Sequence, residues 1–145
     1  MPSLSQNAAE LHALVQEFLQ RFREVDATNA NGPQSDLSMQ ELRVVERLGD
    51  VHSTMMKELA EYMPLAVNSV TSLVDNLEKR RLVRRNRSVE DRRVVNVELT
   101  EEGQAVYQAA VNEKRSLLKL MLGGLNADER EVFMTLFRKI ARAGQ

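Results

Sequence analysis

The sequence LVRRNRSVEDRRVVNVELTEEG, from Leu82 to Gly103, decides the fold of this chain. Apolar and polar residues alternate in its second half, and this period of two predicts a β-strand over Val94–Leu99. A second strand is predicted over Leu82–Arg85. The polar and charged segment Asn86–Arg93, which joins the two strands, is predicted to be the loop of a β-hairpin.

Two short helices are predicted before this hairpin. Thr54 is predicted to cap the first, in which Leu59 faces inward and Met63 lies near the end. Pro64 breaks that helix, so a new helix is predicted over Leu65–Lys79. Two short helices joined by a tight turn form a helix-turn-helix, whose second helix can enter the major groove of DNA. With a hairpin wing after it, this order predicts a winged helix-turn-helix.

Capping signals locate the other helices. Ser38 and Glu41 form a capping box, and the helix that they begin is predicted to run to Leu48 and to stop at Gly49. Two further helices begin at Thr100, with an end near Leu122, and at the capping box of Asn126 and Glu129.

Both ends of the chain carry apolar stripes. Apolar residues recur at steps of three and four in a helix predicted over Gln6–Val25. The last helix has a similar stripe, formed by Val132, Phe133, Leu136, Phe137 and Ile140. We expect these helices to pack against each other and against a second copy of the chain. The predicted fold is mainly α with a small β-hairpin wing. Residues 1–36 form a dimerisation helix and connector, residues 37–100 the DNA-binding lobe, and residues 101–145 further dimerisation helices.

Positive charge is concentrated in one segment. Residues 79–93 contain eight basic and two acidic residues, a net charge of +6 on a chain whose total is −1. The rest of the chain therefore carries −7. A basic segment on an otherwise acidic protein is typical of a surface that meets phosphate groups.

Several classes of function are disfavoured by composition. The chain has no cysteine, which excludes disulfides and thiolate zinc sites, and its two histidines, His12 and His52, have no paired carboxylate spacing to complete a metal site. No phosphate loop, nucleophile elbow or His–carboxylate constellation indicates an enzyme, and no cofactor is expected. Without a signal sequence or a long apolar run, we expect a cytoplasmic protein that does not associate with a membrane.

Three segments together resemble the MarR family of transcription regulators. They are LSMQELRVVERL, KELAEYMPLAVNSVTSLVDNLEKRRLV and VEDRRVVNVELTEEG, which begin at residues 37, 57 and 89. The resemblance implies a dimer built from the terminal helices, palindromic operators, and a small-ligand pocket between the dimerisation and DNA-binding regions. The chain departs from the usual family pattern at Ala66, Val67, Ser72, Asn76, Arg81 and Val89. The helix Leu65–Lys79 is therefore poor in basic residues, and Arg81 replaces a glycine at a helix end.

Candidate DNA contacts lie on this helix and on the wing. Asn68 and Ser69 are predicted to reach base edges, while Thr71 and Ser72 are either base contacts or solvated residues. Arg92 is predicted to enter the minor groove. Arg84, Arg85 and Arg87 are predicted phosphate contacts or exposed charges.

Two residues of the wing have further predicted roles. The resemblance assigns Asp91, paired with Arg93, to shaping the wing. Arg93 is predicted to contact DNA directly or to form a structural ion pair, with Asp75 as one candidate partner.

An effector site is predicted at the junction that the resemblance implies. Its candidate residues are His12, Arg43 and Arg47, with Val15 and Leu19 as an apolar floor. Cationic groups above an apolar floor suit a small anionic aromatic effector. The alternative is that the arginines form surface ion pairs with Glu41, Glu46 or Asp50.

These patterns together predict a regulator that binds a palindromic operator on double-stranded DNA as a homodimer. We expect a repressor, released from DNA by a small molecule. The alternative is a winged-helix adaptor between proteins, because a fold does not determine a function. An adaptor, however, has no need of a charge of +6 on its wing.

Overall fold

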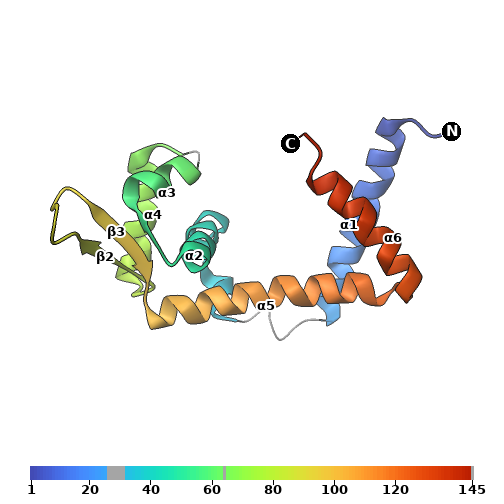
Figure 1. Cartoon of the computed structure of the whole chain (residues 1–145). Helices are drawn as coiled ribbons and strands as arrows, with labels where there is room; N and C mark the ends of the chain where they lie inside the picture. Colours follow the sequence, from blue (N-terminus) through green and yellow to red (C-terminus); the bar gives the residue numbers. More distant parts are fainter. Residues whose placement is uncertain (26–31, 64, 145) are drawn as a thin grey trace. The chain divides into compact units, whose positions relative to one another are not determined.

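The computed structural model describes residues 1–25, 32–63 and 65–144. They form helices and a small antiparallel sheet, which confirms the predicted fold class (Figure 1). The chain divides into two compact units: a central unit, within residues 28–113, and a terminal unit, formed by the two chain ends and beginning again at residue 114. Part of the predicted connector (residues 26–31) and the predicted helix break at Pro64 lie outside the described residues.

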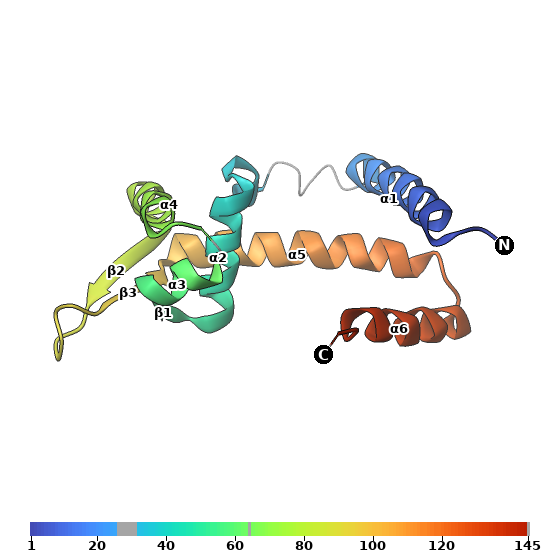
Figure 2. The same ribbon diagram turned by 90° about the horizontal axis from the view of Figure 1, so that it is seen from above.

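The central unit is a winged helix-turn-helix. Its helices are η2 (Pro33–Asp36, a 3-10 helix), α2 (Met39–Val51), α3 (Met56–Tyr62), α4 (Val67–Lys79) and the first half of α5 (Glu101–Gly123). Its strands are β1 (Ser53–Met55), β2 (Val83–Arg87) and β3 (Val95–Leu99). The wing, which we define as β2, β3 and the loop between them, extends beyond α3 and α4 (Figure 2).

The sheet has one strand more than the sequence predicts. β1 pairs antiparallel with β3, so the strand order is β1-β3-β2 and Val97 lies between Thr54 and Arg85. The prediction that Thr54 caps α3 is wrong, because Thr54 belongs to β1 and the N-cap is Met55, which makes no side-chain cap hydrogen bond. The Thr54 hydroxyl instead donates to the Glu58 carboxylate over 3.0 Å.

The predicted cap signals of α2, α5 and α6 are confirmed. Ser38 and Glu41 form the complete capping box at α2, and Asn126 and Glu129 form the one at α6. At α5, the Thr100 hydroxyl accepts a hydrogen bond from the Gly103 N–H over 3.0 Å. These caps act over three residues, and sequence alone is enough to locate them.

The predicted end of α2 at Gly49 is wrong. α2 continues to Val51 and ends at His52, whose φ is +69°. Gly49 is buried within the helix, where a Cβ would overlap the ring of Tyr107 from α5. Glycine is therefore needed at this position because two helices approach each other closely, not because the chain turns there.

The hydrophobic core lies entirely in the central unit. The fully buried side chains come from every part of the helix-turn-helix and the sheet: Val44, Val45, Leu48, Leu59, Met63, Val70, Val74, Leu77, Val83 and Val97. α4 contributes three of them, all on one face. The opposite face of α4 is left for solvent or a partner, and its position is set by this packing.

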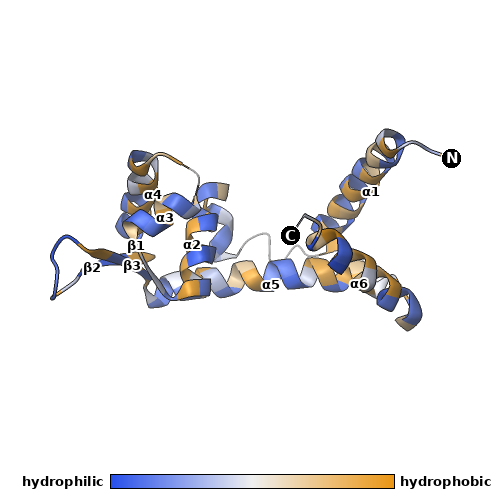
Figure 3. Cartoon of the chain, turned by 45° about the horizontal axis from the view of Figure 1, so that its top comes forward, coloured by the Kyte–Doolittle hydropathy of each residue, from blue (hydrophilic) through white to orange (hydrophobic). Residues whose placement is uncertain are grey.

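The terminal unit has no comparable core. It consists of α1 (Leu4–Val25), the second half of α5, and α6 (Ala127–Ala141). No residue of α1 or α6 is buried, and Leu11, Leu136 and Ile140 are 61, 55 and 68% exposed. Figure 3 shows apolar residues along both helices. The predicted apolar stripes therefore exist, and one copy of the chain leaves them uncovered.

Candidate nucleic-acid interface

The first turns of α4 form one side of the candidate interface. Val67, Asn68 and Ser69 are all exposed, and Val67 retains 61% of its accessible surface. The N-cap Ala66 makes no side-chain cap hydrogen bond, and the first turn holds no acidic residue. Since the N-terminal residues of a recognition helix contact base edges, Asn68 and Ser69 lie where the sequence predicts readers of DNA.

The hydroxyl groups of Thr71 and Ser72 form hydrogen bonds within α4. The Thr71 hydroxyl donates to the Val67 carbonyl over 2.9 Å, and the Ser72 hydroxyl donates to the Asn68 carbonyl over 3.1 Å. Each hydroxyl proton is thus directed at the backbone, which is common for these residues inside a helix. In this arrangement both hydroxyl oxygens can accept a hydrogen bond from the amino group of a base, but their protons are not available to a base or phosphate oxygen.

The wing is joined to α4 by an ion pair. The Arg85 guanidinium contacts Asp75 at 2.5 Å and lies 3.6 Å from Glu78. The candidate ion pair between Arg93 and Asp75 is therefore wrong, because Asp75 pairs with Arg85 and Arg93 pairs with Asp91. Arg85 acts as a link between the wing and α4, since two carboxylates of α4 take up its charge.

Arg84, the preceding residue of β2, also forms an ion pair. Its Nε donates to the Glu98 carboxylate over 2.6 Å, and the Asn86 amide donates to the same carboxylate oxygen over 2.5 Å. The hydrogen bond from Arg84, followed by that from Asn86, lowers the pKa of Glu98. The Arg84 side chain is still 60% exposed, so a phosphate contact at this position stays a prediction.

The loop of the wing is organised around Asp91. Its carboxylate accepts hydrogen bonds from the Arg93 backbone N–H over 3.0 Å and from the guanidinium over 3.1 and 3.3 Å. The side-chain bond from Arg93 is the main cause that lowers the pKa of Asp91. In addition, the Asp91 N–H donates to the Ser88 hydroxyl and its carbonyl accepts from Val94. These contacts are those expected of a wing-shaping residue.

The remaining cations of the wing face solvent. Arg87 and Arg92 are exposed, and the Arg93 side chain is 91% exposed despite its pairing. Neither Arg87 nor Arg92 forms an ion pair with a residue in the described part of the chain. Both therefore retain an uncompensated charge for a phosphate or a groove.

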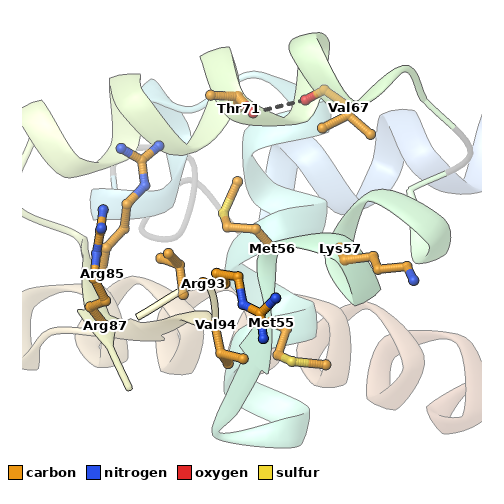
Figure 4. Close-up of a pocket in the computed structure, with 10 residues that line it drawn as sticks. Met55, Met56, Lys57, Val67, Thr71, Arg85, Arg87, Arg93 and Val94 are labelled. Carbon is orange, nitrogen blue, oxygen red and sulfur yellow. Dashed lines mark hydrogen bonds between the residues drawn. The ribbon is translucent and has the colours of Figure 1, made fainter. Parts of the chain in front are cut away.

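A cavity of about 790 Å³ separates the wing from the helices (Figure 4). Its lining comes from β1, α3, α4 and the wing: Met55, Met56, Lys57, Val67, Thr71, Arg85, Arg87, Arg93, Val94 and Val95. Val67 and Thr71 of α4 thus face the same space as Arg87 and Arg93 of the wing. Lys57 is not among the residues that the sequence predicts for this site. The sequence shows no more than a cation at the start of α3.

Arg81 occupies the glycine position at the end of α4. Its φ is +62°, and its N–H donates to the Glu78 carbonyl while that of Leu82 donates to Leu77. This is the Schellman arrangement, in which glycine is usual because a side chain strains the left-handed conformation. The carbonyl of Arg81 also accepts a hydrogen bond from the Thr100 hydroxyl over 2.6 Å.

The candidate effector residues belong to different units. His12 lies on α1, in the terminal unit, whereas Arg43 and Arg47 lie on α2. Arg43 is exposed, and the Arg47 guanidinium stacks 4.3 Å above the ring centre of Tyr62. Two carboxylates considered as partners of the arginines are engaged elsewhere, since Glu41 lies 3.9 Å from Arg80 and Asp50 accepts a hydrogen bond from Tyr107.

Comparison with known proteins identifies the family. The MarR family model matches residues 37–95, which include the helix-turn-helix and most of the wing. The transcriptional regulator HosA of Escherichia coli O127:H6 is 32% identical over 105 residues, which cover 72% of this chain and 78% of HosA. The chain belongs to the MarR family. MarR-family proteins are DNA-binding transcription regulators that act as dimers, and the family is not one of enzymes.

Two further similar proteins extend the comparison. The transcriptional repressor MdtR of Bacillus subtilis is 28% identical over 105 residues, or 72% of this chain and 68% of MdtR. The crystal structure of Streptococcus pneumoniae FabT in complex with DNA shares the fold, with a TM-score of 0.74 and 18% identity over 94% of this chain and 95% of FabT. None of the described helices is long and apolar enough to cross a membrane.

Proposed function

We propose that this MarR-family protein is a repressor that binds a palindromic operator as a homodimer. One observation carries the proposal: Val67 and Thr71 in the first turns of α4 border the same cavity as the exposed wing residues Arg87 and Arg93. A helix in the major groove and a wing in the adjacent minor groove require this arrangement. The repressor named MdtR among the relatives supports the direction of regulation.

The terminal unit supports the homodimer. Its apolar residues are exposed in one copy, including Phe137 at 53% and Ile140 at 68%, and a groove at the α5–α6 corner is lined by Leu125, Val132, Phe133 and Leu136. A small lobe without a core of its own is stabilised when a second copy covers such a surface. Two copies would then present two α4 helices to two half-sites, which favours a palindrome.

The operator test begins with selection of bound sequences from a random duplex pool. Enrichment of an inverted repeat, and binding that weakens steeply with salt, are the expected results. A reporter gene placed behind the enriched sequence should be silenced by the wild-type protein. Failure to enrich any sequence would contradict operator binding and favour the adaptor.

The dimer is tested by replacing Phe133 and Leu136 with aspartate. Because both side chains line the exposed groove, sedimentation should show monomers or misfolded protein. Replacing the exposed polar residue Arg130 of the same helix by aspartate is the control, and the dimer should persist. A well-folded dimer of the double variant would place the interface elsewhere.

We further propose regulation by a small anionic aromatic effector that binds near Arg43 and Arg47 of α2. The support comes from the cationic and aromatic groups of α2 and α3, where Arg47 stacks on Tyr62. A ligand changes DNA affinity only if it binds the free and DNA-bound conformations differently. Titration of salicylate-like acids into the operator complex tests this, and the idea fails if neither operator affinity nor melting temperature changes.

A further inference from the structure

We propose that α4 reads its operator through thymine methyl groups, which it contacts in the major groove with the side chain of Val67. The operator half-site is then recognised mainly through A·T pairs. This inference rests on the proposed operator binding and adds to it the residue and the base that determine specificity.

The first two turns of α4 contain no basic side chain. From Val67 to Val74 the helix carries no charged side chain, and the first charge is Asp75, which pairs with Arg85. The commonest specific contact in the major groove joins an arginine or lysine to guanine. No residue in the first two turns of α4 can make that contact, so these turns must obtain specificity from other features of the bases.

Val67 supplies an apolar contact where a base edge is expected. It lies in the first turn of α4 and is 61% exposed, so the hydrophobic core does not account for its side chain. Val67 and Thr71, one turn later, border the cavity that faces the wing (Figure 4). The only apolar group that a base pair presents in the major groove is the thymine methyl group, and apolar side chains recognise it.

The neighbouring polar residue, Asn68, is also suited to A·T pairs. Asn68 is exposed, and its side chain forms no hydrogen bond to another residue in the described part of the chain. Its amide is therefore available to pair bidentately with the N6 and N7 atoms of adenine. Because the hydroxyls of Thr71 and Ser72 donate to the backbone, they compete less for this role. Together, Val67 and Asn68 offer contacts to both bases of A·T pairs.

The experiment replaces thymines by deoxyuridine, which lacks only the methyl group. The duplex is the sequence that the wild-type protein enriches from a random pool, and each thymine of a half-site is replaced in turn. We expect one position at which affinity falls about fourfold, the effect of one buried methyl group. The Val67→Ala variant should bind the thymine and deoxyuridine duplexes equally at that position.

Val89→Ala is the matched control. Val89 lies in the loop of the wing and is 99% exposed, so this variant loses the same atoms away from α4. It should retain the fourfold preference for thymine, and both variants should keep the wild-type melting temperature.

Three results would contradict the proposals separately. If no sequence is enriched, operator binding itself fails. If an operator is enriched but deoxyuridine is tolerated at every position, operator binding holds and thymine reading is wrong. If Val67→Ala keeps the preference for thymine, a different residue contacts the methyl group.

Discussion

The Arg85 guanidinium lies 2.5 Å from the Asp75 carboxylate and connects the first strand of the wing to the middle of α4. This pair fixes two candidate DNA-binding elements relative to each other, and Arg85 also lies 3.6 Å from Glu78. Two acidic residues on the proposed recognition helix would repel the phosphate groups of DNA. Arg85 offsets that repulsion while its own side chain stays 28% exposed.

The first prediction concerns this ion pair. Arg85→Met should lower the free energy of unfolding by about 1 kcal/mol, because the pair is partly exposed and two carboxylates lose their partner. Operator affinity should also fall, since the wing is no longer held to α4. Urea denaturation and a binding titration measure the two effects.

Arg84→Met is the control for this experiment. It removes the same charge from the preceding residue of β2, where the side chain is 60% exposed and the partner, Glu98, lies in the sheet. Its stability loss should be smaller than that of Arg85→Met. Equal losses of stability and affinity in the two variants would show that the Arg85 contact has no special role.

The second prediction is a stabilising substitution at the end of α4. Arg81 has a φ of +62°, which strains a residue with a side chain. Arg81→Gly should raise the free energy of unfolding by about 0.5–1 kcal/mol. Arg80→Gly, at a φ of −83°, is the control and should destabilise the protein or leave it unchanged. Thermal denaturation should therefore show a higher melting temperature for Arg81→Gly but not for Arg80→Gly, and a loss of stability in Arg81→Gly would contradict the strain.

The third prediction concerns Gly49. A methyl group there meets the ring of Tyr107, so Gly49→Ala should destabilise the protein by about 1–3 kcal/mol even though alanine favours helix. Gly123, in α5, has no atom near its Cβ position, and Gly123→Ala should be neutral or stabilising. Adding Tyr107→Leu to Gly49→Ala should recover part of the loss in chemical denaturation. No recovery would mean that Tyr107 is not the obstacle.

How much the sequence predicts depends on the distance over which each contact acts. The cap at Thr100 and the capping boxes at Ser38 and Asn126 join residues three apart, and all are predicted. For Arg81, the resemblance to the family supplies the signal, because it implies a glycine at this position. The winged helix itself follows from the order of such local signals.

The wrong or absent predictions for β1, Gly49 and Asp75 all concern contacts with residues far away in the sequence. β1 is too short to show a period of two, and it exists because Thr54 pairs with Val97. Gly49 has the sequence signal of a helix end. Its actual role depends on the ring of Tyr107, which lies against it and leaves no room for a Cβ atom. For the ion pair of Asp75, the sequence indicates Arg93 as the candidate partner. Only the register of β2 decides that Arg85 is the one within reach.

The fourth prediction concerns pH. The hydrogen bonds from Arg84 and Asn86 hold the pKa of Glu98 below its ordinary value of 4.5. A carboxyl group whose pKa is lowered by folding adds stability above its unfolded pKa, and that stability is lost as the pH falls through the folded value. Carbon-detected NMR titration should find Glu98 ionised below pH 4.5, and Arg84→Gln should raise its pKa. An unchanged titration in Arg84→Gln would contradict the pairing.

The fifth prediction separates charge from shape in the wing. Arg92 is exposed, so Arg92→Ala should weaken operator binding about tenfold and leave the melting temperature unchanged. Arg93→Ala should weaken binding as well, and it also removes the two hydrogen bonds from the guanidinium to the Asp91 carboxylate. Unchanged affinity in both variants, measured by fluorescence anisotropy at fixed salt, would remove the wing from DNA binding.

Asp91→Ala distinguishes the two effects directly. The charge of the wing and the shape of the wing predict opposite changes in operator affinity for this variant. Removing an acidic residue near phosphate groups strengthens binding if only electrostatics matter. Asp91, however, holds the loop through Arg93, Ser88 and Val94. We therefore expect Asp91→Ala to weaken operator binding although it makes the wing more positive. The neighbouring exposed Glu90 is the control, and Glu90→Ala should leave affinity unchanged or raise it. If the two variants bind the operator equally tightly, the contacts of Asp91 do not shape the wing for DNA.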